Sequence, residues 1–259
     1  MDLRARHIKG VMENGIAEVN GVMRHPSADK KARIKSMFNL MLDYALEYEI
    51  VDKNYARTFE VSNDIIKERA AMKRGHIPFT DAEIAKLWSV IDDIEWVDVV
   101  LYQCYSGWRP QELGLIELEN VDVVNWTVVG GMKTDAGRNR IVPVHPRLRP
   151  VIKKHYDKAV SLGSKYLFNC TDTKTHRSSL MLTYDKYSQR YERIRDCLEL
   201  NPDHRAHDGR KHFVTQAKKA NVDEYAIKYM VGHAINDITE KVYTERELPW
   251  LAEEIAKIP

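Results

Sequence analysis

The chain has few cysteines and no long hydrophobic run, and each shortage excludes a class of protein. Its three cysteines, Cys104, Cys170 and Cys197, are widely spaced and odd in number, which argues against a disulfide framework and favours reduced thiols in a cytosol. No pair of cysteines or histidines has the spacing of zinc ligands. The apolar stretches fall well short of the ~20 residues of a membrane span, and the N-terminus lacks the apolar core of a signal peptide. We therefore expect a cytoplasmic protein that does not enter a membrane.

The net charge of +2 hides an uneven distribution along the 259 residues. Residues 129–219 hold 20 Lys and Arg against 9 Asp and Glu, whereas residues 74–128 hold 3 against 10. A basic segment beside an acidic one indicates a surface for a polyanion, although an unevenly charged solvated surface is the alternative. The composition, 44% hydrophobic and 30% charged, is that of an ordinary globular protein.

Helical patterns fill most of the chain, and one charged stretch divides it. After Pro26–Ser27, apolar residues recur at steps of three and four as far as Tyr48, which predicts a helix. The stretch Lys67–Ile77 is charged, contains Gly75 and ends before Pro78, so it is the expected linker between two domains, residues 1–73 and 74–259.

The second domain is expected to combine helices with a small antiparallel sheet. Thr80-Asp-Ala-Glu83 is a capping box that predicts a helix start. Residues 126–129 and 140–144 are the expected strands of a hairpin, and residues 167–168 are a possible further short strand. Further helices are expected at about residues 95–105, after Pro146, at 182–198 and at 248–258. The predicted fold is mainly α with a small antiparallel β-sheet.

The segment from His207 to Tyr243 gathers residues suited to chemistry on a phosphodiester. His207 and Arg210 are three apart, so on a helix they project from one face. Gly232 can end the next helix in a left-handed cap and expose His233 at the corner, ten residues before Tyr243. Neither a carboxylate cluster for a metal nor a glycine-rich phosphate loop lies beside these residues, so neither a metal nor a cofactor is expected.

This order of His-x-x-Arg, Gly-His and Tyr resembles the tyrosine recombinases, which include phage and conjugative-transposon integrases. The resemblance implies an arginine upstream, and Arg109 lies in Ser-Gly-Trp-Arg-Pro-Gln-Glu-Leu. It also implies a lysine on a β-hairpin between the two arginines, and Lys133 lies in Met-Lys-Thr-Asp. The site that it implies has six catalytic residues: Arg109, Lys133, His207, Arg210, His233 and Tyr243.

The resemblance also implies their roles in cutting and rejoining DNA. Tyr243 attacks phosphorus and forms a covalent 3′-phosphotyrosyl bond, while the two arginines bind the phosphate oxygens. Lys133 is the general acid for the leaving group. His207 assists proton transfer from Tyr243, and His233 donates a hydrogen bond to a non-bridging oxygen.

The resemblance also implies two domains and several partners. Residues 1–73 correspond to a helical core-binding domain that clamps double-stranded DNA at specific core sites, short or truncated at its start, and residues 74–259 to an α+β catalytic domain. The apolar stripe of residues 248–258 docks into a neighbouring subunit of a homotetramer. An accessory DNA-bending protein is a further possible partner, and insertion or excision of mobile DNA in the nucleoid is the expected activity.

Two other functions share these features. A catalytically silent DNA-binding protein would keep the fold, and a type IB topoisomerase would share the phosphotyrosyl chemistry but only relax DNA. A metal-dependent nuclease fits least. Two positions depart from the family pattern: Trp108 is bulkier than usual, and Gly209 replaces a leucine, which lowers helix propensity by about 1 kcal/mol and would let the helix start approach DNA. His212, five residues after His207, is interpreted as a packing residue.

Overall fold

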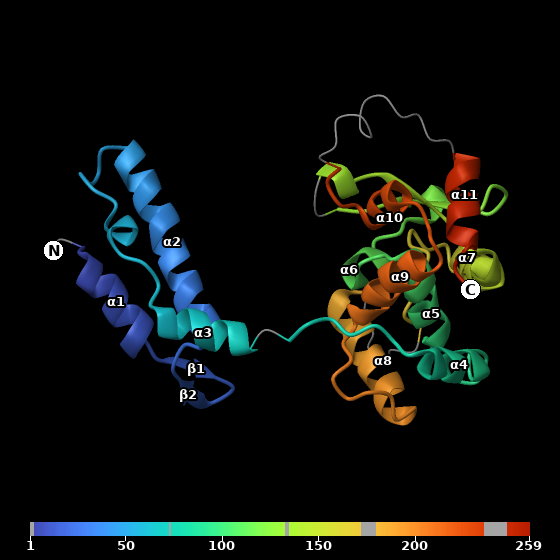
Figure 1. Cartoon of the computed structure of the whole chain (residues 1–259), viewed down its shortest axis with the longest axis horizontal. Helices are drawn as coiled ribbons and strands as arrows, with labels where there is room; N and C mark the ends of the chain where they lie inside the picture. The colour runs from blue at the N-terminus through green and yellow to red at the C-terminus, as the bar shows by residue number, and fades with distance from the viewer. Residues whose placement is uncertain (1–2, 73, 133–134, 172–179, 236–247) are drawn as a thin grey trace. The chain divides into compact units, whose positions relative to one another are not determined.

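The computed structural model describes residues 3–72, 74–132, 135–171, 180–235 and 248–259, and it divides the chain into two compact units (Figure 1). The N-terminal unit is Met1–Gly75, and the C-terminal unit is His76–Pro259. The expected linker is helical in its first half, because α3 (Asn63–Met72) continues as far as Met72. This part of the linker prediction is therefore wrong.

The N-terminal unit adds a β-hairpin to its helices. Its described elements are α1 (Ala5–Asn14), β1 (Ala17–Val19), β2 (Val22–Arg24), α2 (Ala28–Glu47), the 3-10 helix η1 (Tyr55–Thr58) and α3. β1 and β2 pair antiparallel around Asn20 and Gly21, whose φ angles of 53° and 76° are positive, as in a type I′ turn. The prediction of a helical N-terminal domain did not include this hairpin, for which Asn-Gly was the sequence signal.

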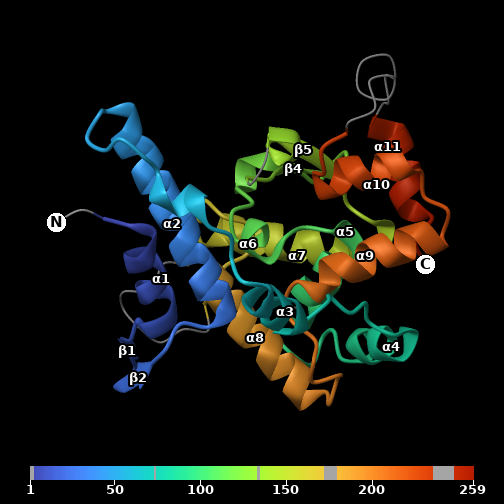
Figure 2. The same cartoon turned by 60° about the vertical axis from the view of Figure 1, so that its left-hand side comes forward.

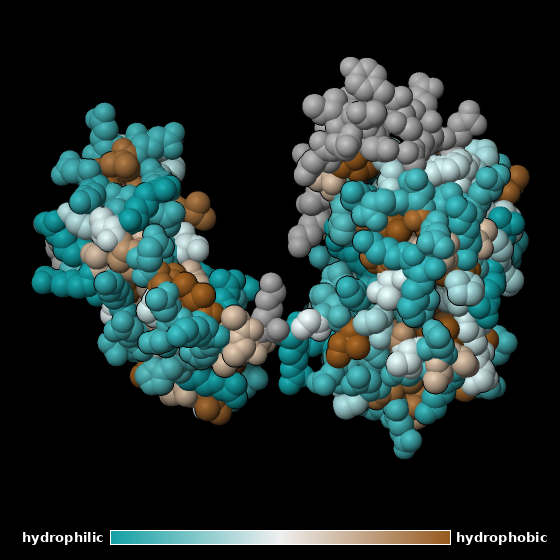
Figure 3. All heavy atoms as spheres, viewed as in Figure 1, coloured by the Kyte–Doolittle hydropathy of each residue, from teal (hydrophilic) through white to brown (hydrophobic). Residues whose placement is uncertain are grey.

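The core of this unit lies where one face of α2 packs against α1 and η1. The buried residues of the core are Ile8, Met12, Leu42 and Ala56. Ile34 and Phe38 of α2 pack against them. The expected apolar stripe of α2 is wider than this buried face, and four of its members are exposed: Met37, Met41, Tyr44 and Tyr48. The face of the unit seen in Figure 3 accordingly shows hydrophobic residues among hydrophilic ones.

The C-terminal unit surrounds a buried helix, α5, with other helices and a small sheet. Its described α-helices are α4 (Asp81–Ser89), α5 (Val97–Ser106), α6 (Pro110–Leu113), α7 (Arg149–Ser161), α8 (Tyr184–Cys197), α9 (Asp208–Lys219), α10 (Glu224–Val231) and α11 (Leu248–Ala256). Short 3-10 helices cover Leu118–Asn120, Asp135–Gly137 and Pro146–Leu148. The capping box predicted at Thr80 is formed, since Thr80 Oγ1 accepts from the Glu83 backbone N–H and Glu83 Oε2 accepts from that of Thr80.

The sheet consists of β3 (Val121–Asp122), β4 (Thr127–Gly130) and β5 (Arg140–Pro143) in the order β3-β4-β5, all antiparallel. β4 and β5 form the predicted hairpin, with Val128 opposite Val142. Residues 167–168 do not form a strand: both are buried in the core, and only their neighbours Tyr166 and Asn169 make isolated bridges. The prediction of a mainly α fold with a small antiparallel sheet is confirmed.

Helix α9 lies directly against α5, as Figures 1 and 2 both show. Every residue of α5 is buried, including the polar residues Asp98, Gln103 and Ser106, each of which makes a hydrogen bond. At Gly209, a Cβ would come within 2.5 Å of Gln103 Oε1 on α5. This glycine therefore lets the start of α9 approach α5, whereas the expected approach of the helix start to DNA stays a prediction.

The C-terminal helix packs on its own unit. Leu251, Ile255 and Ile258 are buried in the core of the C-terminal unit, and a hydrogen bond of 2.9 Å joins His145 Nε2 to the carbonyl oxygen of Ile258. Within the single chain, its own unit covers the stripe of residues 248–258, so the expected docking of this stripe into a neighbouring subunit stays a prediction. None of the described helices has the length and apolar character needed to cross a membrane.

Candidate active site

Arg109 lies at a sharp turn between two helices. α5 ends at Gly107, where φ is 70° and a Cβ would come within 2.5 Å of the Phe213 ring, so only glycine fits. The chain passes through Trp108 and begins α6, with Arg109 as the N-cap and Pro110 as the first residue, as predicted. Since α6 has only four residues, the positive charge here comes from the guanidinium and very little from a helix dipole.

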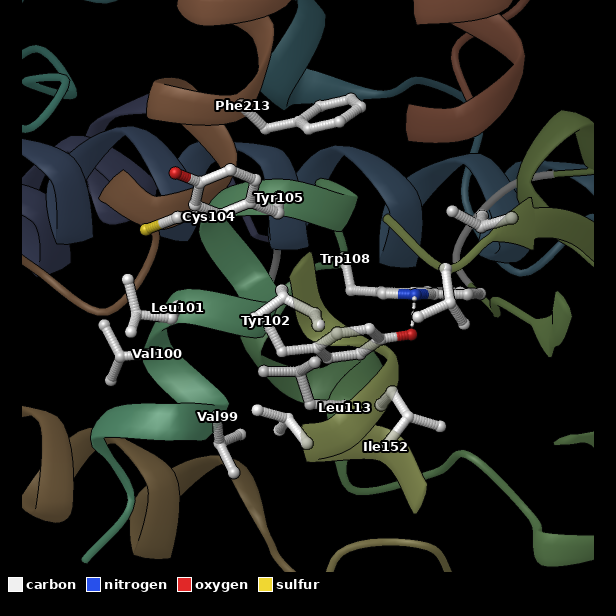
Figure 4. Close-up of a cluster of buried hydrophobic side chains, with 14 of the residues drawn as sticks. Val99, Val100, Leu101, Tyr102, Cys104, Tyr105, Trp108, Leu113, Ile152 and Phe213 are labelled. Carbon is white, nitrogen blue, oxygen red and sulfur yellow. Dashed lines mark hydrogen bonds between the residues drawn. The ribbon is translucent and has the colours of Figure 1, made fainter. Parts of the chain in front are cut away.

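Trp108 fixes the backbone immediately before Arg109. Its side chain is fully buried, and its Nε1 donates a hydrogen bond of 3.1 Å to the hydroxyl of Tyr102 on α5 (Figure 4). Its carbonyl oxygen accepts from Gln103 Nε2 at 3.2 Å, and the Tyr187 hydroxyl donates to Gln103 Oε1 at 2.8 Å. The bulky departure from the family pattern is thus an anchor for the arginine that follows it.

Glu112 is a buried carboxylate that joins two arginines. Its Oε1 accepts from Arg109 Nη1 at 2.7 Å, and its Oε2 accepts from Arg140 Nη2 at 2.6 Å. Burial by itself raises the pKa of Glu112, but the hydrogen bond and charge of Arg140, followed by the N–H and charge of Arg109, lower that pKa to about 2. Glu112 is therefore ionised at neutral pH and orients the side chain of Arg109.

Arg140 was missing from the residues predicted from the sequence. It lies at the start of β5, is 2% exposed, and stacks on the Trp108 ring with its Cζ 4.1 Å from the ring centroid. Its Nε donates to the Met230 carbonyl at 2.8 Å and its Nη1 to the Gly137 carbonyl at 2.9 Å. Strand alternation was the available signal, because it places Arg140 on the same side as the fully buried Val142.

Arg210 connects the segments that carry the other candidate residues. It is 7% exposed on the first turn of α9. Its Nη1 donates to the Gly107 carbonyl at 2.7 Å, two residues before Arg109, and its Nη2 to the Val231 carbonyl at 2.5 Å, two residues before His233. Burial, then the charges of Arg109 and Arg140, lower the pKa of Arg210 to about 9, so it stays positive at neutral pH.

His207 is the N-cap of α9, one turn before Arg210. Burial lowers the pKa of His207, and the charges of His76, Arg210 and Arg109 lower it further. The imidazole is therefore mostly neutral at neutral pH and can accept a proton. The ring of His76 lies against it, with ring centroids 5.0 Å apart.

His233 follows the helix end that the sequence predicted. Gly232 caps α10 with φ 65° and ψ 48°, in the left-handed region, and the N–H of His233 donates to the Lys228 carbonyl at 2.9 Å. The side chain of His233 is exposed at this corner. Partial desolvation of the imidazole, then the charges of Arg210 and Arg109, lower the pKa of His233.

The structure therefore brings four of the six predicted residues into one electrostatically coupled site: Arg109, His207, Arg210 and His233. Lys133 and Tyr243 lie outside the described residues. By sequence, Lys133 belongs to the connection between β4 and β5, and Tyr243 to that between α10 and α11. Within the described ranges, no three His, Cys, Asp or Glu side chains are grouped to hold a metal ion. His212 packs as predicted, with its Nδ1 3.1 Å from the Phe79 carbonyl oxygen.

Comparison with known proteins places this site in a family. The profile of the phage integrase family matches residues 79–248. The integrase from mycobacterium phage Brujita is 16% identical, with a TM-score of 0.56 over 99% of this chain and 78% of that one. The integrase of transposon Tn1549, solved in complex with circular intermediate DNA, is 16% identical, with a TM-score of 0.65 over 98% and 85%.

A lambda integrase dimer bound to a COC′ core site is 13% identical, with a TM-score of 0.62 over 95% of this chain and 84% of that one. At these identities the likeness establishes the fold. A search of curated proteins found no match.

Proposed function

Because this chain belongs to the phage integrase family, we propose that it is a site-specific DNA recombinase that cuts and rejoins DNA through a covalent 3′-phosphotyrosyl intermediate, without a metal. One observation carries the proposal. The buried guanidinium of Arg210 donates to the carbonyl oxygens of Gly107 and Val231, so a single side chain of α9 joins the segments that carry Arg109 and His233 to the helix that begins after His207.

Tyr243 is the proposed nucleophile. Its phenol oxygen forms a bond to phosphorus, and the 5′ oxygen of the next nucleotide leaves, so the energy of the phosphodiester is kept for rejoining. Negative charge gathers on the non-bridging oxygens in the transition state. The two fixed guanidiniums of Arg109 and Arg210 are proposed to stabilise this charge. Removing one such donor typically lowers the rate by about 100- to 1000-fold. Glu112 and Trp108 hold Arg109 in place for this role.

Proton transfers accompany both bond changes. The phenol of Tyr243 loses its proton as it attacks, and His207, whose pKa is lowered by burial, is the proposed acceptor. The leaving oxygen gains a proton, which Lys133 is proposed to supply from the connection between β4 and β5. His233 is proposed to donate a hydrogen bond to a non-bridging oxygen, since it stands exposed at the corner after α10.

The proposed substrate is double-stranded DNA at specific core sites. The basic segment of residues 129–219 supports this, because neutralised phosphates release counterions. The solved Tn1549 integrase and lambda integrase are each bound to DNA, which is consistent with the same substrate. The N-terminal unit, residues 1–73 in our assignment, is proposed to clamp the duplex, and recombination between two sites requires several copies of the chain. Integration or excision of a mobile element is the proposed role.

The experiment uses nicked suicide duplexes tiled across the DNA repeats that flank the gene. The wild-type chain is expected to form a covalent protein–DNA complex that survives denaturing gel electrophoresis, equally with and without EDTA. Tyr243→Phe should form none while still shifting the same duplexes in native gels. Tyr184→Phe, an exposed tyrosine on α8, is the matched control and should react normally.

Two results would contradict the proposal. One is a covalent complex formed by Tyr243→Phe, which would place the nucleophile elsewhere. The other is activity that disappears with EDTA. Relaxation of a supercoiled plasmid without exchange between two sites would indicate a topoisomerase, and duplex binding without any covalent complex would indicate a silent DNA-binding protein.

A further inference from the structure

The first residue of the C-terminal unit reaches the candidate active site. His76 lies just before α4 in the sequence and far from α9, yet its ring packs against that of His207, with centroids 5.0 Å apart and an interplanar angle of 41°. Its Nδ1 lies 3.1 Å from Asp208 Oδ1, on the residue next to His207. None of the motifs in the sequence pointed to His76.

The anchor of His76 is itself held rigidly. Asp208 is 1% exposed, and its second oxygen, Oδ2, accepts from the Arg205 backbone N–H at 2.9 Å and lies 3.1 Å from His204 Nδ1. On the other side of its ring, His204 Nε2 lies 3.2 Å from Glu83 Oε1. A chain of interacting groups, of which His204 and Asp208 are buried, thus runs from Glu83 on α4 to the start of α9 and ends at the exposed ring of His76.

The charges along this chain are complementary. Burial alone raises the pKa of Asp208, but the hydrogen bonds from His204, Arg205 and His76 lower it, so Asp208 is ionised. Burial alone lowers the pKa of His204, but Asp208 and Glu83 raise it. An ionised Asp208 accepts a hydrogen bond, so the Nδ1 of His76 is the donor.

We propose that His76 is a positioning residue of the active site: anchored on Asp208, its ring holds the ring of His207 in place at the start of α9. This inference rests on the proposed function, in which His207 accepts a proton. The groups that face His207 are His76, Arg210 on the same helix and Arg109 at the start of α6, and all three disfavour a second positive charge there.

A titration tests the contact without any DNA. Histidine ring signals of the full chain are followed by NMR against pH, and the signal of His207 is identified by its loss in His207→Gln. Removing the ring and charge of His76 in His76→Ala should raise the pKa of His207 by at least about 0.5 unit. His76→Lys places an ammonium donor beside Asp208 and should leave the pKa of His207 at or below its wild-type value. His25→Ala replaces an exposed histidine of the N-terminal unit and is the control, which should leave the pKa of His207 unchanged.

Cleavage of the suicide duplexes tests the role in catalysis. In His76→Ala, the acidic limb of the pH–rate profile should move to higher pH by the same shift, and the rate at its plateau should fall at least about tenfold, because His207 is no longer held in place. A residue that only stabilised the fold would lower the active fraction at every pH and leave the midpoint unchanged.

The outcomes separate the two proposals. An unchanged pKa of His207 in His76→Ala, or an unchanged midpoint and plateau in cleavage, would overturn the role of His76 while the wild-type covalent complex upholds the recombinase. A wild-type chain that forms no covalent complex would instead overturn the proposed function and the catalytic role of His76 with it, even if the titration confirmed the contact.

Discussion

Replacing Arg210 by lysine keeps a positive charge on α9 but removes the planar donor that joins two backbone segments. In the structure, the two Nη atoms of Arg210 donate to the carbonyl oxygens of Gly107 and Val231, which belong to the ends of α5 and α10. A lysine ammonium is compact and cannot reproduce this fork. At least one carbonyl would lose a charged donor, and one such hydrogen bond contributes about 1.5–3 kcal/mol. We therefore expect Arg210→Lys to lower the free energy of unfolding of the C-terminal unit by that amount.

The assay is urea unfolding followed by tryptophan fluorescence. All five tryptophans lie after residue 75, so the signal reports the C-terminal unit alone. Cleavage of suicide duplexes by Arg210→Lys should also fall at least about 100-fold, because Arg109 and His233 lose their common support. Arg193→Lys, the same substitution on an exposed position of α8, should change the free energy of unfolding by less than about 0.5 kcal/mol. An Arg210→Lys chain with the stability and cleavage rate of the wild type would refute this reasoning.

Three further predictions concern the same unit. Glu112→Gln should lower the free energy of unfolding by about 3–5 kcal/mol, because it leaves the buried charge of Arg140 without a counterion. The control is Glu192→Gln at an exposed position of α8, and an equal unfolding midpoint for the two variants would contradict this prediction. Burial lowers the pKa of His212 to about 4, below its unfolded value near 6.5, so its stabilising contribution is complete above pH 6.5 and is lost as pH falls toward 4. Urea unfolding from pH 7 to 4 should therefore show a weaker pH dependence for His212→Gln, and identical slopes would exclude this role. Gly209→Ala should lower the free energy of unfolding by about 1–3 kcal/mol, since its Cβ would lie 2.5 Å from Gln103 Oε1. Gly10→Ala on α1 has nothing within 4 Å of its Cβ and should raise the free energy of unfolding by about 0.5–1 kcal/mol. Circular dichroism during unfolding measures both changes.

Local signals in the sequence predicted much of this fold. The capping box at Thr80, the glycine cap at Gly232 and the hairpin of β4 and β5 depend on short-range geometry, and the structure has all three. The resemblance to the tyrosine recombinases is likewise confirmed, since the family match covers residues 79–248. The type I′ hairpin at Asn20 and Gly21 also had a local signal, the Asn-Gly pair, but the prediction of a helical first domain did not use it.

Long-range packing is what the sequence did not reveal. Arg140, Glu112 and His76 contribute to the site through partners 28 to 132 residues away, and no periodicity or spacing encodes such contacts. The apolar stripe of α11 was predicted correctly as a helix face, but its pattern is the same whether its own unit or another subunit covers it. The roles of Lys133 and Tyr243 remain predictions, because they rest on the order of the residues along the chain.

The close approach of Gly137 and Gly232 has a mechanical consequence. A Cβ on Gly232 would lie 2.7 Å from the Cα of Gly137, so two backbones touch with no side chain between them. One belongs to the connection between β4 and β5, and the other immediately precedes His233. A displacement of that connection toward α10 would therefore push on the backbone of Gly232, and the peptide bond that joins Gly232 to His233 would pass this movement from the sheet to the histidine.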